Sequence, residues 1–340
     1  MKHLFFVNSH TSFLSAVGTV NYLELHSDDV IFFAARHYKN SLLEVEWSIF
    51  DISDVFAQYT DHEIWRNRSI RQIFQKNMDN LINKYIHDQY KLYCAHYAHP
   101  GVQMLYTNSN CVEGCYIQEG GVPFKTTFVT KVSLEKKLFY WMVNNIYLRT
   151  KRCHYPVVWY YPGFLNKQEN VHSYAISDSF FKYLPSINHI IKWPIKKVDI
   201  KIPRNSTIFI FDGFVYHGLC EKEFYLQCCN RLILEEKSEN NLLRFHPAQS
   251  EDEKKSIISY FKENDLAFEI MDSSIPFEWI LISSSQKFKV TGFGSSLLFF
   301  SKDYGHDVVC RDEWLSSSKM YKKYKKENGF LFFRESYCTD

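Results

Sequence analysis

The sequence predicts an α/β protein with two Rossmann-like domains that face a central cleft. Continuous apolar strands alternate with helical stretches in two separate sets, which is typical of parallel sheets covered by helices on both faces. Residues 191–206 divide the two sets, because this segment is basic, contains prolines and has no helical period. A chain of 340 residues also suits two ordinary domains better than one core.

The first domain is expected to span residues 1–200. Its apolar runs predict buried strands, and its longer runs of helical period predict the helices between them. The expected strands are 2–7, 28–35, 90–96 and 111–117, and the expected helices are 12–25, 69–86 and 133–148.

The second domain is expected to span residues 201–310. Its expected strands are 207–211, 241–245, 266–271 and 287–292, and its expected helices are 220–236 and 250–264. Ser250 suits the N-cap of the last helix, and the acids that follow it suit the first turn. Because ligands of such sheets bind beyond the carboxyl ends of the strands, the residues that follow the strands are the first candidates for a site.

The overall composition is that of a globular protein without a nucleic-acid partner. The chain is 46% hydrophobic and 23% charged, and its formal net charge of +2 does not suggest a basic face. The first residues lack the apolar core of a signal peptide, and no apolar run approaches the ~20 residues of a membrane helix. With nine cysteines and no CxxC pair, the sequence predicts a cytoplasmic protein.

The tail over residues 311–340 is basic and aromatic and is expected to begin as a helix. Its pattern fits a solvated surface helix. It also fits peripheral attachment to the anionic inner face of the cell membrane.

A first candidate site lies in NNLLRFHPAQ, over residues 240–249. Pro247 keeps the backbone of His246 out of helical geometry, so the imidazole is expected at the lip of the strand. There it can donate to a phosphate, with Arg244 adding positive charge. A His-Pro pair is more often structural, and the chain contains a second pair, His99-Pro100, for comparison.

A second candidate lies in TGFGSSLLFF, over residues 291–300, where a strand, a glycine turn and an apolar helical run follow one another. Backbone amides near Gly294 and the hydroxyls of Ser295 and Ser296 can hold a phosphate. The simpler interpretation is a serine N-cap. Upstream, Glu278 in IPFEWI stands in the first turn of an expected helix, where it can bind a ribose diol or simply stabilise the helix.

Glu119 ends the strand over 111–117 and precedes two glycines. A carboxylate on a strand tip can act as a general base, although it is as readily an acid in a turn. Asp212 is a rival base that can also line a nucleotide pocket or make a turn. His10 follows the first strand and is a candidate contact for an acceptor or a sugar.

These stretches, in this order, resemble the bacterial GT-B sialyltransferases that use CMP-sialic acid, and the bacterial polysialyltransferases share the same motifs. IPFEW followed by TGFGSSLLFF is especially similar to the donor half of the multifunctional sialyltransferases. The likeness is specific over about residues 240–300. The acid-acid-Gly, His-Pro and Ser-Ser motifs of this group stand here as Gln118-Glu119-Gly120, His246-Pro247 and Ser295-Ser296.

The resemblance implies an inverting transfer of sialic acid from CMP-sialic acid to a sugar hydroxyl of a surface glycan such as lipooligosaccharide, O-antigen or capsule. Glu119 would be the base, and His246, Ser295 and Ser296 would stabilise the CMP leaving group. Arg244, Pro247, Glu278 and Gly294 would complete the nucleotide site. The implied partners are the donor and an oligosaccharide acceptor, without a metal or another cofactor.

One position departs from the family pattern, since Gln118 replaces the first acid. This departure leaves open that the chain is a non-catalytic assembly partner with the same fold. Because His-Pro elements also occur in polymer-building transferases, another CMP- or CDP-activated donor in the assembly of surface polymers is a second alternative.

Overall fold

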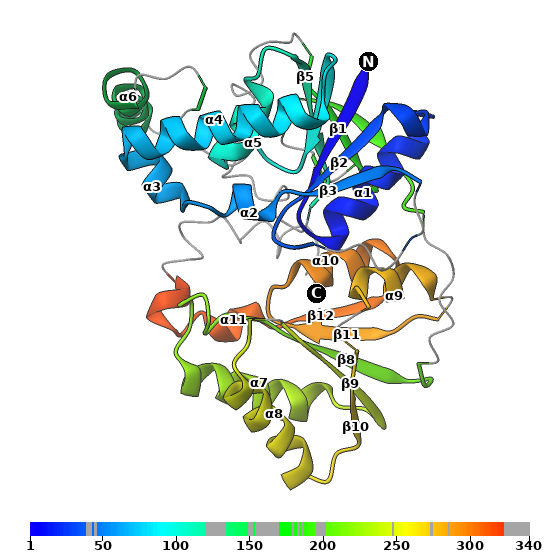
Figure 1. The fold of residues 1–340 in the computed structure, drawn as a ribbon. Coiled ribbons are helices and arrows are strands. Elements are labelled where there is room, and N and C mark those ends of the chain that lie inside the picture. Colours follow the sequence, from blue (N-terminus) through cyan, green and yellow to red (C-terminus); the bar gives the residue numbers. More distant parts are fainter. Residues whose placement is uncertain are drawn as a thin grey trace. The chain divides into compact units, whose positions relative to one another are not determined.

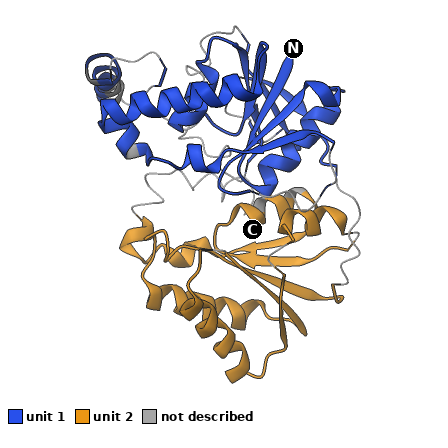
Figure 2. Cartoon of the chain, viewed as in Figure 1, with its two compact units in different colours: residues 1–194 blue, residues 195–340 orange. Residues whose placement is uncertain are grey.

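A computed structural model gives the fold of the chain, which divides into two compact units, Met1–Pro194 and Ile195–Asp340 (Figure 2). Each unit is an α/β body with its own sheet. The structure describes residues 1–38, 43, 46–119, 134–148, 152–153, 170–178, 180–181, 184, 186–194, 202–246, 248–272, 275–284 and 286–322.

Unit 1 contains a seven-stranded sheet in the order β3-β2-β1-β4-β5-β6-β7, and every neighbouring pair is parallel. The strands are β1 (Lys2–Val7), β2 (Val30–Ala34), β3 (Ser48–Asp51), β4 (Tyr90–Cys94), β5 (Cys111–Ile117), β6 (His172–Ala175) and β7 (Ile187–Ile190). The strand order reverses at β1, which lies between β2 and β4. This reversal is the topological switch point, where ligands of open α/β sheets bind.

The helices of unit 1 connect these strands (Figure 1). They are α1 (His10–Tyr22), η1 (Ser27–Asp29), α2 (Ser53–Phe56), α3 (Asp61–Arg66), α4 (Arg68–Tyr85), α5 (Pro100–Tyr106), α6 (Leu134–Met142) and the π-helical η4 (Val143–Leu148). Helix α1 starts directly after β1, because Ser9 and Ser12 form a capping box at its first turn.

Unit 2 contains a five-stranded parallel sheet in the order β10-β9-β8-β11-β12. Its elements are β8 (Ser206–Phe211), α7 (Lys222–Glu236), β9 (Asn240–Phe245), α8 (Glu251–Glu263), β10 (Phe268–Ile270), α9 (Phe277–Ser283), β11 (Lys289–Gly292), α10 (Ser296–Asp303), β12 (Asp307–Cys310) and α11 (Asp312–Leu315). Helices α7 and α8 cover one face of the sheet, and α9 and α10 cover the other (Figure 1). The switch point of this sheet is β8, between β9 and β11.

The predicted fold class of two Rossmann-like α/β domains is confirmed, because both units have parallel sheets with the Rossmann-like reversal of strand order. The division after Pro194 falls inside the segment 191–206 that the sequence assigned to the linker, six residues before the expected boundary at 200. The expected separate tail begins inside unit 2, since Leu315 and Tyr321 are buried in its hydrophobic core. Residues 323–340 of that tail lie outside the described part of the chain.

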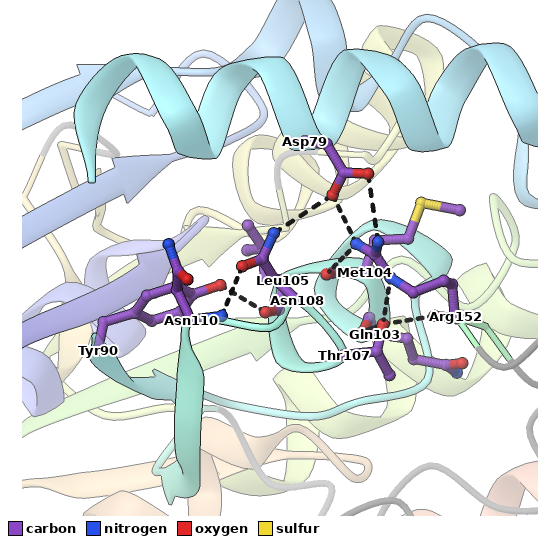
Figure 3. A network of polar contacts seen from close by, with 9 residues as sticks. All are labelled: Asp79, Tyr90, Gln103, Met104, Leu105, Thr107, Asn108, Asn110 and Arg152. Carbon is purple, nitrogen blue, oxygen red and sulfur yellow. Dashed lines mark hydrogen bonds and ion pairs between the residues drawn. The ribbon is translucent and has the colours of Figure 1, made fainter. Parts of the chain in front are cut away.

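A polar network closes unit 1 at the amino ends of β4 and β5, on the edge of the sheet away from the switch-point loops (Figure 3). Asp79 on α4 accepts hydrogen bonds from Arg152 at 2.6 and 3.2 Å and from the Asn108 side chain at 3.3 Å. The buried Tyr90 hydroxyl donates to the Leu105 carbonyl at 2.6 Å. These contacts hold α4, α5 and the amino ends of β4 and β5 together, so the residues at this edge of the sheet have a structural role.

No helix in the described ranges is both long enough and apolar enough to cross a membrane. The same ranges contain no group of three or more His, Cys, Asp or Glu residues placed to hold a metal ion.

Candidate active site

Asp212 occupies the switch point of unit 2, directly after β8. The hydroxyl of Tyr225 on α7 accepts a hydrogen bond from the Asp212 backbone N–H at 2.9 Å and donates to the Asp212 carbonyl at 3.0 Å. Tyr225 is fully buried in the core of the unit, so it holds the backbone of Asp212 firmly at this edge. Only 8% of Asp212 is exposed.

Ser295, the serine predicted to hold a phosphate, affects the ionisation of this carboxyl group. Ser295 is the N-cap of α10, and its hydroxyl oxygen accepts the Leu297 N–H at 3.4 Å. The Ser295 hydroxyl acts on the pKa of Asp212 in the direction that favours the ionised form of the carboxyl group. Burial outweighs that effect and raises the pKa of Asp212 to about 7.

His246 lies against the same turn. A Cβ added to Gly213 would lie 2.8 Å from Nδ1 of His246, so only glycine at position 213 lets the imidazole pack this closely on the backbone. The ring stands edge-on to His217, with 5.8 Å between the two centroids. Burial, and secondarily the neighbouring His217, lower the pKa of His246, so its neutral form is favoured.

The tautomer of His246 follows from its contacts. Nδ1 accepts a hydrogen bond from the Ala248 N–H at 3.1 Å, and an acceptor nitrogen carries no proton. In the neutral ring the proton is therefore on Nε2. Within the described ranges Nε2 has no hydrogen-bond partner, so it can donate to an anion.

The second His-Pro pair shows the difference between a structural and a free imidazole. Nδ1 of His99 accepts the Gly101 N–H at 3.0 Å, which is the same local turn that His246 makes. Nε2 of His99, however, faces Asp61 at 3.0 Å, and the ring stacks on Phe56. His99 is thus the side chain that caps α5.

The remaining predicted residues of the donor half lie around these groups. The Arg244 side chain donates to the Asp272 carbonyl at 2.5 Å beyond the end of β10, and Glu278 in the first turn of α9 is among the charges that act on it. Gly294 is buried in the turn between β11 and α10, and Ser296 is the first residue of α10. Pro247 lies outside the described residues.

In unit 1, Glu119 follows the end of β5 and bonds with the loop after β1. The Ser9 hydroxyl donates to Oε1 of Glu119 at 3.1 Å, and Ser9 is also the N-cap of α1. Burial raises the pKa of the Glu119 carboxyl group, while the Ser9 bond and the charge of Arg36 oppose that rise. Gly120 lies outside the described residues.

Two further residues come to this edge from the ends of β1 and β2. His10 begins α1, and its ring meets Tyr38 edge-on with 5.1 Å between centroids. Arg36 follows β2 with a left-handed φ of 59°, and His37 follows it with a φ of 53°. Consecutive left-handed residues are strained in chains of L-amino acids, and such strain often marks functional loops.

Gln118 has a structural role. It is 1% exposed, and its side-chain oxygen accepts the Ile176 N–H at 2.9 Å, while its own backbone N–H donates to the Tyr174 carbonyl at 3.0 Å. A carboxamide at this position therefore ties β5 to the loop after β6. At this strand tip Glu119 is thus the side chain with a carboxyl group.

The sequence did not indicate three of these residues. Ser9, Arg36 and Tyr225 each act through a partner that the fold brings close, and none belongs to a recognisable motif. Gly213 carried a local signal, because glycine after an acid at a strand tip indicates a tight turn.

No family model matches this sequence, and no curated protein matches it. Among solved structures, a sialyltransferase from Photobacterium damsela is similar with a TM-score of 0.48 and 13% identity, over 95% of this chain and 78% of that chain. MurG of Acinetobacter baumannii is similar with a TM-score of 0.41 and 8% identity, over 98% of this chain and 93% of that one. The spinosyn forosaminyltransferase SpnP is similar with a TM-score of 0.47 and 10% identity, over 91% of this chain and 79% of that chain. These scores and identities are too low to assign a substrate or a reaction to this chain.

The role of Gln118 predicts the effect of its replacement. Gln118→Leu keeps the side-chain volume but leaves the Ile176 N–H without its acceptor, so the free energy of unfolding should fall by about 1–3 kcal/mol. Gln118→Glu keeps an acceptor and should cost less. Chemical denaturation of both variants measures the difference, and equal stability of Gln118→Leu and the wild type would contradict the structural role.

Proposed function

We propose that the chain is a glycosyltransferase that transfers sialic acid from CMP-sialic acid to a sugar hydroxyl of a surface glycan. The observation that supports this proposal best is the group at the switch point of unit 2. There His246 presents an Nε2–H donor and packs against Gly213, and Ser295 presents a hydroxyl at the start of α10. Neutral donors together with a helix N-terminus suit a phosphate group.

The chemistry of transfer uses such donors directly. When the bond between the anomeric carbon and the phosphate oxygen breaks, negative charge grows on the phosphate of the departing CMP. Donors that are fixed before the reaction stabilise this charge without reorganising, and removing one of them commonly lowers the rate by 10²–10³. His246 and Ser295 are the proposed donors, with Glu278 and Arg244 in the region proposed for the ribose.

Glu119 is the proposed general base, which takes the proton of the acceptor hydroxyl as that oxygen attacks the anomeric carbon. Its raised pKa suits this role, because a base works best when its pKa approaches the pH of the reaction. The bond from Ser9 fixes one carboxyl oxygen and leaves the other for the substrate. Because Gln118 makes a structural contact at the position of the first acid, Glu119 is the acid proposed to act as the base.

The function is tested with CMP-sialic acid alone. Purified protein should release CMP slowly without an acceptor, because water replaces the sugar hydroxyl, and EDTA should leave the rate unchanged if fixed donors replace a metal. Liquid chromatography of the nucleotide measures the release. A non-catalytic assembly partner would release no CMP, whereas inhibition by EDTA that Mg²⁺ reverses would contradict transfer without a metal.

Replacement of the base should separate chemistry from binding. Glu119→Gln keeps the shape and the Ser9 contact but cannot accept a proton, so transfer should fall by about 10²–10⁴. The Kd for CMP should remain within about twofold of that of the wild type. Radiolabelled transfer and calorimetry measure the two quantities, and a Glu119→Gln variant with full activity would reassign the base.

The two His-Pro pairs supply a matched comparison. His246→Ala should lower kcat/KM for the donor by about 10²-fold, because the Nε2–H donor is lost. His99→Ala should leave kcat/KM unchanged and lower the free energy of unfolding by about 1 kcal/mol, because α5 loses its cap. Equal losses of activity in the two variants would contradict the proposed role of His246 as a donor to the phosphate.

A further inference from the structure

Helix α6 (Figure 1) and the π-helical η4 that continues it present an exposed apolar face on unit 1. This apolar face is made of Leu138, Phe139, Trp141, Met142 and Ile146, which are 46–59% exposed. The described ranges contain fifteen exposed large apolar side chains, and five of them lie within these nine residues. Exposed apolar side chains that are scattered singly need no explanation, whereas a contiguous group marks an interaction surface.

The spacing of these residues places them on one side of the helical segment. Leu138, Met142 and Ile146 follow one another at intervals of four residues, and side chains three or four residues apart are neighbours on a helix surface. Trp141 comes three residues after Leu138, and Phe139 comes three residues before Met142. The five side chains therefore form a continuous stripe, as in a helix that buries one face.

The end of this segment is fixed to the body of unit 1. Leu148, the last residue of η4, is 3% exposed, and its carbonyl accepts a hydrogen bond from the Arg71 side chain of α4 at 3.2 Å. Arg71 is itself buried and also donates to the carbonyls of Ile64 and Trp65, both at 3.2 Å. The apolar face thus belongs to a segment that the fold holds in place.

The sequence around the apolar face is strongly basic. Residues 131–152 contain six lysines and arginines against one acid, Glu135, which gives a net charge of +5, whereas the whole chain carries +2. Arg152 is paired with Asp79 at 2.6 Å, so a charge of +4 remains. An apolar stripe with tryptophan and phenylalanine on a basic segment is typical of helices that lie in the surface of an anionic membrane.

We propose that α6 and η4 bind the surface of an anionic lipid membrane. The apolar face lies at the boundary between the headgroups and the acyl chains, and the positive charge of residues 131–152 attracts the anionic headgroups. The basic tail was the segment for which the sequence suggested such a contact, and this segment of unit 1 is a different one. The inference does not depend on the proposed donor, because it uses no residue of the candidate active site.

A second copy of the chain fits the apolar face less well than a membrane does. A stable protein–protein interface draws on about 20–30 residues from each partner, whereas five apolar side chains gather here. A twofold contact uses the same surface on both partners, so it would also bring the same basic segment against itself. Like charges repel in that arrangement, whereas anionic headgroups attract them.

The experiment measures the binding of the full chain to lipid vesicles by co-sedimentation. The wild type should bind vesicles of equal parts phosphatidylcholine and phosphatidylglycerol. Leu138→Ser combined with Trp141→Ser should weaken this binding by at least about 10-fold, because the apolar face is interrupted. The matched control combines Leu234→Ser with Ile270→Ser in unit 2, where the side chains are 44% and 49% exposed, and it should bind as the wild type does.

A second variant tests the charge separately from the apolar face. Lys136→Gln combined with Lys137→Gln should weaken binding to the anionic vesicles on the order of 10-fold and leave the weak binding to pure phosphatidylcholine vesicles unchanged. Both residues belong to the basic segment, and their replacement removes no apolar side chain of the stripe. Equal binding of this variant and the wild type to the anionic vesicles overturns the inference.

The other outcomes identify what the apolar face does instead. A wild type that binds neither kind of vesicle overturns the inference, and so does a Leu138→Ser/Trp141→Ser variant that binds as well as the wild type. Sedimentation velocity without lipid should show the same oligomeric state for both proteins. A wild-type dimer that this variant fails to form, without vesicle binding, assigns the face to a second copy of the chain and overturns the membrane contact.

Discussion

The parallel direction of every strand pair is the constraint on which the rest of the molecule depends. In a parallel sheet all strands end at the same edge, so residues far apart in the sequence meet there. In unit 2 this edge brings the turn after β8 against the turns after β9 and β11, and Gly213 permits the imidazole of His246 to touch its backbone. Without the reversal of strand order at β8, the turns after β9 and β11 would not flank Asp212.

Each unit has a helix-capping serine that acts on a buried carboxyl group, and the two carboxyl groups are suited to different roles. In each, the serine that caps a helix after a strand favours the ionised form of a buried carboxyl group, Ser9 that of Glu119 and Ser295 that of Asp212. Burial raises both pKa values, but Arg36 favours the ionised form of Glu119, and no described cation does so for Asp212. The first carboxyl group is therefore suited to accept a proton and the second to keep one.

Several elements could be predicted from the sequence and others could not. Apolar runs revealed the central strands, such as β1, β5 and β8, whereas the short strands β3, β7 and β12 contain no fully buried residue and have no such run. His246 and Ser295 stood out because they belong to motifs. The Ser9–Glu119 contact, the role of Gln118 and the clamp by Tyr225 depend on partners brought together by the fold, which a single sequence does not reveal.

The central claim is that the switch point of unit 2 binds the phosphate of a cytidine nucleotide, and a crystal structure of the protein with CMP tests it most directly. The account predicts a phosphate oxygen within hydrogen-bond distance of Nε2 of His246 and of the Ser295 hydroxyl, at the start of α10. Nucleotide bound elsewhere, with its phosphate on neither side chain, would contradict the account.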